Sequence, residues 1–165
     1  MKQTIRILIL FSLFLILAVP SSSQPKDVVG WQGTRWGMSE QDLIGVFGSR
    51  LKKLPKRMDF LKWHVDYVIP EFQLENNIYT VFFQMDDKTN KLAQVLIRLN
   101  EMESQIPREQ IFNNLVSLLT REYGSPSGNA DNRYSFLVKY KGIDLSRTWK
   151  FPTTTIELGY GWDSQ

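Results

Sequence analysis

The chain of 165 residues contains no cysteine and a single histidine, His64. These two scarcities exclude disulfide bonds, thiol catalysis and the cysteine- and histidine-rich ligand sets of structural zinc sites. A serine triad would have to use His64, and Pro126 occupies the nucleophile position in the only stretch, Gly124–Gly128, that resembles a G-x-S-x-G turn. Nucleotide-binding patterns such as G-x-G-x-x-G and the Walker sequence are absent as well. We therefore predict no catalytic residue, no metal and no cofactor.

Long apolar runs are missing too, with one exception at the N-terminus. Residues 7–19 are apolar except for Ser12, they follow Lys2 and Arg6, and small residues come after Pro20. These three features are typical of a secretory signal peptide. A helix over this run would be about 20 Å long, which is short of the roughly 30 Å of a bilayer core, so a cleaved signal is favoured over a retained membrane anchor.

The N-terminal prefix also accounts for most of the net charge. We predict cleavage after Ser23, with Ser21 as the alternative site, which gives a signal peptide (1–23) and one domain (24–165). Removing the prefix takes away two basic residues and no acidic one, so 18 basic and 17 acidic residues remain and the net charge falls from +3 to +1. A nearly neutral domain gives no reason to expect a nucleic-acid partner. The predicted location is periplasmic or secreted, and a protein anchored by an uncleaved N-terminal segment is the alternative.

Two segments carry the signals of an α-helix. The first begins after Ser39, a residue that caps helix N-termini, and Asp42 stands where a capping box needs an acceptor. Gly48 predicts the end of this helix. The second runs over Pro107–Tyr123, where apolar residues recur on one helical face before Gly124.

Strand patterns dominate the rest of the chain. The predicted strands are Gly30–Trp36, Val65–Leu74, Ile78–Met85, Leu92–Leu99, Tyr134–Tyr140, Leu145–Phe151 and Thr153–Tyr160. Residues 86–90 are predicted to form a hairpin loop, and Pro70 requires an edge position or a bulge. Residues 49–62 and 125–132 are predicted to be irregular.

These strands follow one another too closely for parallel crossovers. The sequence therefore predicts an α+β fold, with an antiparallel sheet of five to six strands and two helices packed on one face. Each helix ends in an aromatic residue followed by glycine, Phe47-Gly48 and Tyr123-Gly124, and leads into strands. Duplication of a helix-plus-sheet unit and the common chemistry of helix ends explain this similarity equally well.

A basic stretch is the most distinctive polar feature, with five cations within residues 50–57. The candidate residues for contact with a partner or a lipid are Arg50, Lys52, Lys53, Lys56, Arg57 and Trp63. Cations interleaved with apolar groups suit an anionic lipid headgroup or an acidic protein partner. Alternatively, the stretch is a solvated loop that protects an edge strand from aggregation.

Acidic residues leave one enzymatic interpretation open, because the carboxylate pairs of glycosidases have no local sequence signature. The candidate acids are Asp59, Asp66, Glu71, Glu75, Glu101 and Glu103. All stand beside predicted turns, which favours solvated surface positions. His64, next to Trp63, is predicted to lie at a sheet edge or on the surface.

Three stretches resemble a family of small uncharacterised exported bacterial proteins. They are the W-x-G-x-x-W-G-M-S motif at Trp31–Ser39, the Y-G-x-P motif at Tyr123–Pro126, and the stretch Thr148–Ile156. The layout of helices and antiparallel strands is also similar to that of β-lactamase-inhibitor-protein and BamE-like envelope domains. That second resemblance implies binding to other proteins.

The sequence therefore predicts an exported, non-catalytic interaction module of the bacterial cell envelope. Its expected partner is an envelope protein or an anionic lipid surface, and neither nucleotide nor nucleic acid is expected. A carboxylate-dependent hydrolase of cell-wall or polysaccharide material and an anionic-lipid-binding protein are the alternatives.

Overall fold

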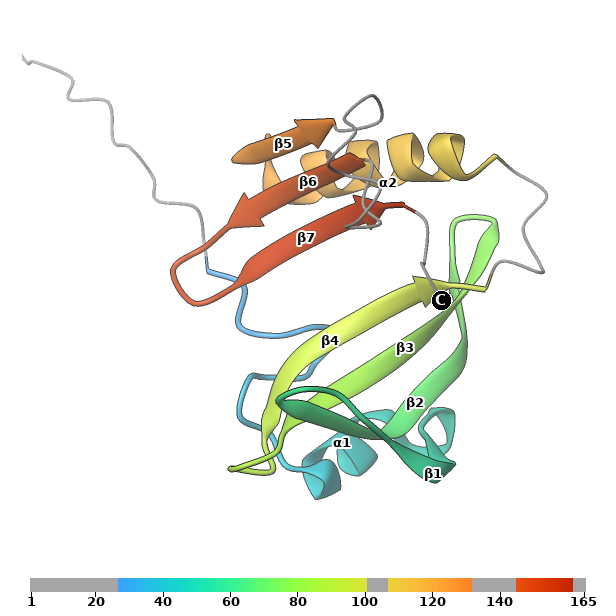
Figure 1. Cartoon of the computed structure of the whole chain (residues 1–165), viewed down its shortest axis with the longest axis vertical. Coiled ribbons are helices and arrows are strands. Elements are labelled where there is room, and N and C mark those ends of the chain that lie inside the picture. Colours follow the sequence, from blue (N-terminus) through green and yellow to red (C-terminus); the bar gives the residue numbers. More distant parts are fainter. Residues whose placement is uncertain (1–26, 101–106, 132–144, 162–165) are drawn as a thin grey trace, which may run out of the picture.

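A computed structural model of the chain describes residues 27–100, 107–131 and 145–161 (Figure 1). In these ranges the elements are α1 (Glu40–Phe47), the 3-10 helix η1 (Gly48–Arg50), β1 (Lys52–Asp59), β2 (Trp63–Leu74), β3 (Asn77–Asp86), β4 (Leu92–Leu99), α2 (Arg108–Tyr123), β5 (Gly128–Asp131), β6 (Leu145–Lys150) and β7 (Thr155–Tyr160). The predicted signal peptide, 1–23, and the strand predicted at Tyr134–Tyr140 lie outside the described residues.

The strands form two antiparallel sheets. The first has the order β1-β2-β3-β4 and the second the order β5-β6-β7. The predicted α+β class with two helices and antiparallel strands is confirmed, but the single sheet of five to six strands is wrong. The division falls at α2, whose 16 residues separate β4 from β5. Periodicity identifies strands but does not report which of them pair across such an insertion.

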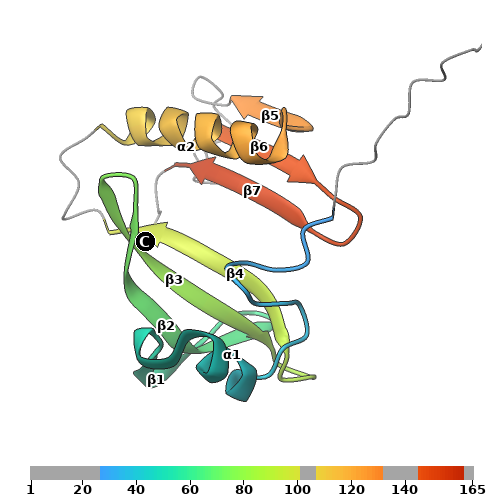
Figure 2. The same cartoon turned by 180° about the vertical axis from the view of Figure 1, so that it is seen from behind.

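Each helix packs on its own sheet. α1 contributes Leu43 and Phe47 to the core of the first sheet, whereas α2 packs on β7, where the ring centroids of Phe112 and Tyr160 lie 6.4 Å apart. The prediction that both helices cover one face is therefore wrong. The chain forms a first unit (α1, η1 and β1–β4) and a second unit (α2 and β5–β7), and in each the described strands follow a helix and pair antiparallel in chain order (Figures 1 and 2).

The predicted capping box fixes the start of α1. The Asp42 amide donates to Oγ of Ser39, and the Ser39 amide donates to the Asp42 carboxylate at 2.8 Å. Gly48 ends the helix with a φ of +53°, a conformation that glycine adopts without strain. Both boundaries confirm the prediction, because they depend on residues adjacent in sequence.

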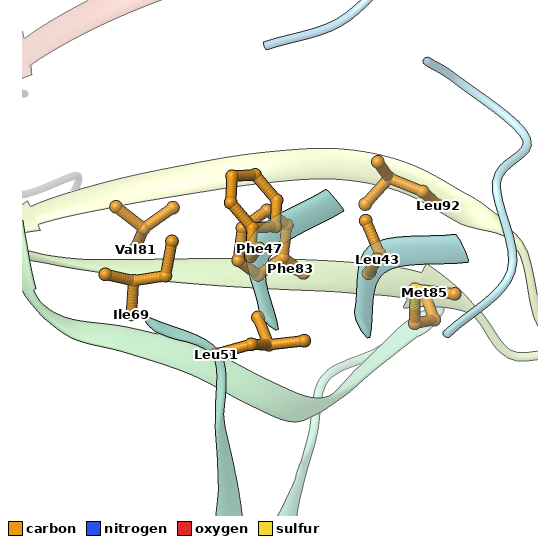
Figure 3. Close-up of a cluster of buried hydrophobic side chains, with 8 residues drawn as sticks. All are labelled: Leu43, Phe47, Leu51, Ile69, Val81, Phe83, Met85 and Leu92. Atoms are coloured by element: carbon orange, nitrogen blue, oxygen red, sulfur yellow. The ribbon is translucent and has the colours of Figure 1, made fainter. Parts of the chain in front are cut away.

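The core of the first unit lies between α1 and the sheet (Figure 3). Alternate residues of β3 point into it, as the two-residue period of a strand requires. The buried cluster consists of Leu43, Phe47, Leu51, Ile69, Val81, Phe83, Met85 and Leu92. Burial of such side chains stabilises a domain by about 1.5–3 kcal/mol each, before the loss of conformational entropy is counted.

The central hairpin confirms the sequence prediction closely. β4 has the predicted bounds, and β3 extends one residue beyond the prediction at each end. Asp86 closes the loop, because its Oδ1 accepts hydrogen bonds from the Lys88 and Thr89 amides. β2 begins at Trp63, two residues before the predicted start, and its register shifts between Ile69 and Phe72, around Pro70, as a bulge requires.

Two predictions about the N-terminal half are wrong. The strand predicted at Gly30–Trp36 is a series of turns, because Gln32 and Gly33 both have positive φ values and Thr34 closes a turn onto Trp31. The stretch predicted to be irregular contains β1, which pairs with β2 at the edge of the first sheet. Long charged side chains hide the strand pattern there, and they are a usual feature of edge strands.

The C-terminal strands are predicted with small errors. β6 and β7 lie within the predicted ranges, whereas β5 falls in the predicted loop 125–132. The Gly128–Asp131 segment has no apolar alternation, and its strand conformation comes from pairing with β6.

Residues 27–38, which we call the linking segment, precede α1 and contact both units through hydrogen bonds. Its end pairs with β4, since the Gly37 amide donates to the Leu92 carbonyl and the Leu92 amide donates to the Met38 carbonyl. Its start reaches the turn between β6 and β7, where the Thr153 hydroxyl donates to the Asp27 carboxylate at 2.6 Å. This segment therefore connects the edge of one sheet to the turn of the other.

Candidate functional site

A large cleft lies between the two units, with a volume of about 1050 Å³. Its walls come from β4 and β7, from one face of α2 and from the linking segment. A hollow of this size is large enough to hold a ligand.

The cleft is bordered by the edges of two strands. β4 ends the first sheet and β7 ends the second, and both views place these strands side by side (Figures 1 and 2). The consecutive residues Ala93–Ile97 and Thr155–Leu158 line the cleft. Because neighbouring side chains of a strand point to opposite faces, an unbroken run of lining residues means that the cleft meets each strand at its edge.

Apolar side chains form most of the rest of the wall. α2 contributes Leu115, Leu118 and Leu119, whose helical spacing places them on one side. The linking segment and β2 contribute Trp31 and Phe72, whose rings meet edge to face at 5.2 Å. This wall is suited to apolar side chains of a ligand.

Polar residues line the cleft as well, among them Arg121, Glu122 and Glu157, and two further polar groups lie at its wall. The Tyr79 hydroxyl is buried, has no hydrogen-bond partner, and belongs to a residue that lines the cleft. Burial, and secondarily the charge of Glu75, raises the pKa of Tyr79, so its hydroxyl is a neutral donor. Trp36 Nε1 donates to Oγ1 of Thr154 at 2.7 Å and ties the linking segment to the second unit at the cleft wall.

A second polar cluster lies around His64 in the first unit. His64 is only 3 % exposed and belongs to β2, an inner strand, so the prediction of an edge or surface position is wrong. Its Nδ1 lies 2.8 Å from Oδ1 of Asp87, and its Nε2 lies 3.1 Å from Oδ1 of Asn90. These two partners come from the β3–β4 loop, which folds over the ring and compensates for its burial.

Two carboxyl groups adjoin this cluster. Asp66, two residues after His64 on β2, and Glu40, at the start of α1, hydrogen-bond to each other. Burial, then the charge of Asp66 and the hydrogen bond between them, raises the pKa of Glu40. Sequence reasoning included Asp66 among its acids but missed Glu40, because a residue in a helix N-terminal turn is explained by the helix dipole alone.

The six predicted contact residues do not form one site. Arg50 lies over the Phe47 ring at 5.2 Å, and Lys53 lies over the Tyr67 ring at 5.8 Å. Arg57 bonds to Asp59 and Asp87.

The other three predicted contact residues are equally dispersed. Lys52 and Lys56 are exposed on β1, and Trp63 is half-buried at the start of β2. Arg50 and Lys52 share a smaller hollow of about 400 Å³. None of the six lines the large cleft.

The candidate acids are mostly dispersed as well. Glu71 and Glu75 are exposed near the ends of β2 and β3, and Asp59 is exposed on β1. Glu101 and Glu103 lie outside the described residues. Neither the large cleft nor the smaller hollow is lined by Glu40 or Asp66. The one close carboxyl pair that we describe is therefore separate from both hollows.

No known protein family, no curated protein and no solved structure matches this chain. Within the described ranges, no helix has the length and apolar character that crossing a bilayer requires.

Proposed function

We propose that this protein is an exported, non-catalytic binding module of the bacterial cell envelope, and that it binds an extended segment of a partner protein in the cleft between β4 and β7. The observation that supports this proposal is the pair of strand edges that border one apolar cleft. Export itself rests on the signal-peptide pattern of residues 1–23.

Strand edges favour a peptide ligand over a compact one. An edge strand presents backbone amides and carbonyls that have no partner within its own sheet, and an extended peptide satisfies them by adding a strand. Alternate side chains of the peptide would then point toward α2 and toward the linking segment. The leucines of α2 and the ring of Trp31 offer apolar contacts to them.

The direction of the two edges suits one inserted strand. The arrows of β4 and β7 point the same way in both views (Figures 1 and 2). A peptide that runs antiparallel to one is therefore antiparallel to the other, and antiparallel pairing is the pattern within both sheets. The Tyr79 hydroxyl is buried in the wall, and it would donate to a polar group of the bound segment once binding shifts the wall and uncovers it.

The alternative functions have less geometric support. A polysaccharide hydrolase needs its two carboxyl groups in a substrate cleft. The Glu40–Asp66 pair lines neither hollow, and none of the described candidate acids lines the large cleft, whose carboxyl residues are Glu122 and Glu157. A lipid surface needs its cations on one face, whereas Arg57 is paired with Asp59 and Asp87.

A peptide library tests the proposal directly. The probes are capped heptapeptides that alternate Val, Ile or Leu with polar residues, measured by calorimetry against the purified protein. We expect one peptide to bind per chain and to slow hydrogen exchange at amides of β4. If no peptide binds, or if the bound peptide leaves β4 exchange unchanged, strand addition at this cleft is refuted.

One variant localises the interaction. Ile97 on β4 lines the cleft and is 36 % exposed, so Ile97→Glu places a charge in the apolar wall. The expected effect is a loss of peptide affinity of about tenfold or more, since the contact of one apolar side chain is worth about 1.5–3 kcal/mol. Leu61→Glu is the matched control, because Leu61 is 95 % exposed and does not line the cleft. Equal losses in both variants would place the peptide elsewhere.

A further inference from the structure

Two elements of the first unit, α1 and β2, bring one histidine and two carboxyl groups together. Glu40 begins α1, and His64 and Asp66 lie two residues apart on β2, so their side chains share one face of the strand. One ligand atom of each lies within 4.8 Å of those of the other two. His64 is buried, whereas Glu40 and Asp66 are half-buried, which leaves the cluster open to solvent on the carboxyl side. It is separate from the cleft lining.

A hydrogen bond from Nδ1, on the side of the ring away from Nε2, fixes the orientation of the His64 imidazole. Nδ1 donates to Oδ1 of Asp87 at 2.8 Å, and Asp87 also accepts from Arg57 at 2.9 Å. A neutral imidazole that donates from Nδ1 carries its lone pair on Nε2. A carboxylate behind the ring is also the usual support of a metal-binding histidine, because it fixes the tautomer and raises the basicity of the ligating nitrogen.

Oxygen atoms gather around this lone pair. Oδ1 of Asn90 lies 3.1 Å from Nε2, and Oδ2 of Asp66 lies 3.7 Å from it. The carboxyl group of Glu40 completes the group. When Nε2 carries a proton, it donates to Asn90 Oδ1. In the neutral tautomer protonated on Nδ1, the same oxygens face the Nε2 lone pair, and a cation between them turns a repulsive arrangement into an attractive one.

We propose that Glu40, His64 and Asp66 bind a divalent first-row transition cation, with zinc as its best match. Metal–ligand distances of about 2.0–2.2 Å place tetrahedral ligand atoms about 3.4 Å apart. The ligand atoms here lie within 4.8 Å of one another, so the cluster contracts around the ion by up to about 1.4 Å. The imidazole nitrogen selects zinc over Mg²⁺ and Ca²⁺, which prefer oxygen ligands alone. The Asn90 amide oxygen or a water molecule supplies the fourth position.

Such an ion would connect parts of the chain that are distant in sequence. It joins the start of α1 to β2, and through Asp87 and Asn90 to the β3–β4 loop. Because the chain has no cysteine, this site gives an exported protein a cross-link that needs no disulfide. The sequence prediction of no metal considered cysteine- and histidine-rich sites, and this site uses a different ligand set.

The single histidine makes the test unambiguous. The protein is purified from cells that produce the full chain, treated with a chelator, and titrated with Zn²⁺ while the imidazole nitrogens are observed by ¹⁵N NMR. We expect one Zn²⁺ per chain and a coordination shift at Nε2, with the proton retained on Nδ1. An unchanged Nε2 signal at saturating Zn²⁺, or a ring that carries protons on both nitrogens throughout the titration, would overturn the proposal.

Conservative variants test the carboxyl ligands without removing volume. Glu40→Gln and Asp66→Asn are each expected to weaken Zn²⁺ binding at least tenfold in calorimetry. Glu71→Gln, which removes an exposed charge further along β2, is the control and should bind as the unaltered protein does. If Glu71→Gln loses as much affinity as the other two, the ion is held by general surface charge and the proposed site is wrong.

Discussion

Tyr79 belongs both to the buried face of its strand and to the lining of the cleft. Its ring is part of the buried face of β3, yet its hydroxyl has no hydrogen-bond partner and the residue lines the cleft. A buried hydroxyl without a partner costs stability, and proteins retain such groups where a ligand satisfies them. A substitution of Tyr79 is therefore expected to affect the free energy of unfolding and the affinity for a peptide differently.

Tyr79→Phe should change the two properties in opposite directions. Removing the hydroxyl is expected to leave the free energy of unfolding unchanged or to raise it by about 1 kcal/mol, since the removed group made no bond. Affinity for the peptide should fall, because the donor is lost. Urea unfolding and calorimetry on the same preparation measure both. A variant that is less stable and binds equally well would assign the hydroxyl a purely structural role.

At the scale of elements, local signals and long-range pairing contribute differently. α1, α2 and the β3–β4 hairpin are predicted well because caps, glycine stops and alternation act within a few residues. The sequence analysis misses β1 and β5 because neither shows a clear alternation of apolar and polar side chains. The side chains of β1 are mostly charged and those of β5 are small. Pairing with β2 and with β6, respectively, imposes their extended conformation. The candidate cleft is missed for the same reason, since it lies between elements whose pairing partners no local pattern specifies.

The capping box of α1 provides a direct measure of a local signal. Ser39→Ala removes the oxygen that accepts from the Asp42 amide, and we expect the free energy of unfolding to fall by about 1 kcal/mol. Ser49→Ala, at an exposed position in η1, is the control and should cost much less. Urea denaturation of both variants decides the point. An equal loss at the two positions would mean that the cap adds nothing to α1.

At the scale of the whole molecule, the linking segment bonds to both units and lines the cleft between them. It contacts β4 through Gly37 and Met38, and it contacts the second unit through Asp27 and Trp36. Loss of these bonds would let the units separate and the cleft widen. The contacts with the second unit span 118 and 126 residues of sequence, so only the folded chain brings them together.

The Asp27 contact is expected to depend on pH. The hydrogen bond from the Thr153 hydroxyl lowers the pKa of Asp27, with further contributions from the Thr153 and Val28 amides. Because the pKa is lower in the folded state, the stabilisation is present above the unfolded pKa of about 4 and is lost as the pH falls through the folded pKa.

The comparison of Asp27→Ala with the unaltered protein measures how much the Asp27–Thr153 hydrogen bonds stabilise the fold at each pH. The variant should unfold at a lower urea concentration at pH 7, and the difference should shrink as the pH is lowered below 4. Glu71→Gln controls for the simple loss of an exposed negative charge. A difference in midpoint that stays constant with pH would show that the carboxylate does not carry the link.

The sequence by itself determined the α+β class, the two helices with their ends, the central hairpin and the export pattern at the N-terminus. These features depend on residues close together in the chain, where capping, period and turn chemistry act directly. The tertiary structure alone decided that the strands divide into two sheets, that β4 and β7 border a cleft, and that Glu40 meets His64 and Asp66. Those arrangements depend on backbone pairing and burial between distant segments, for which a single sequence carries no local signal.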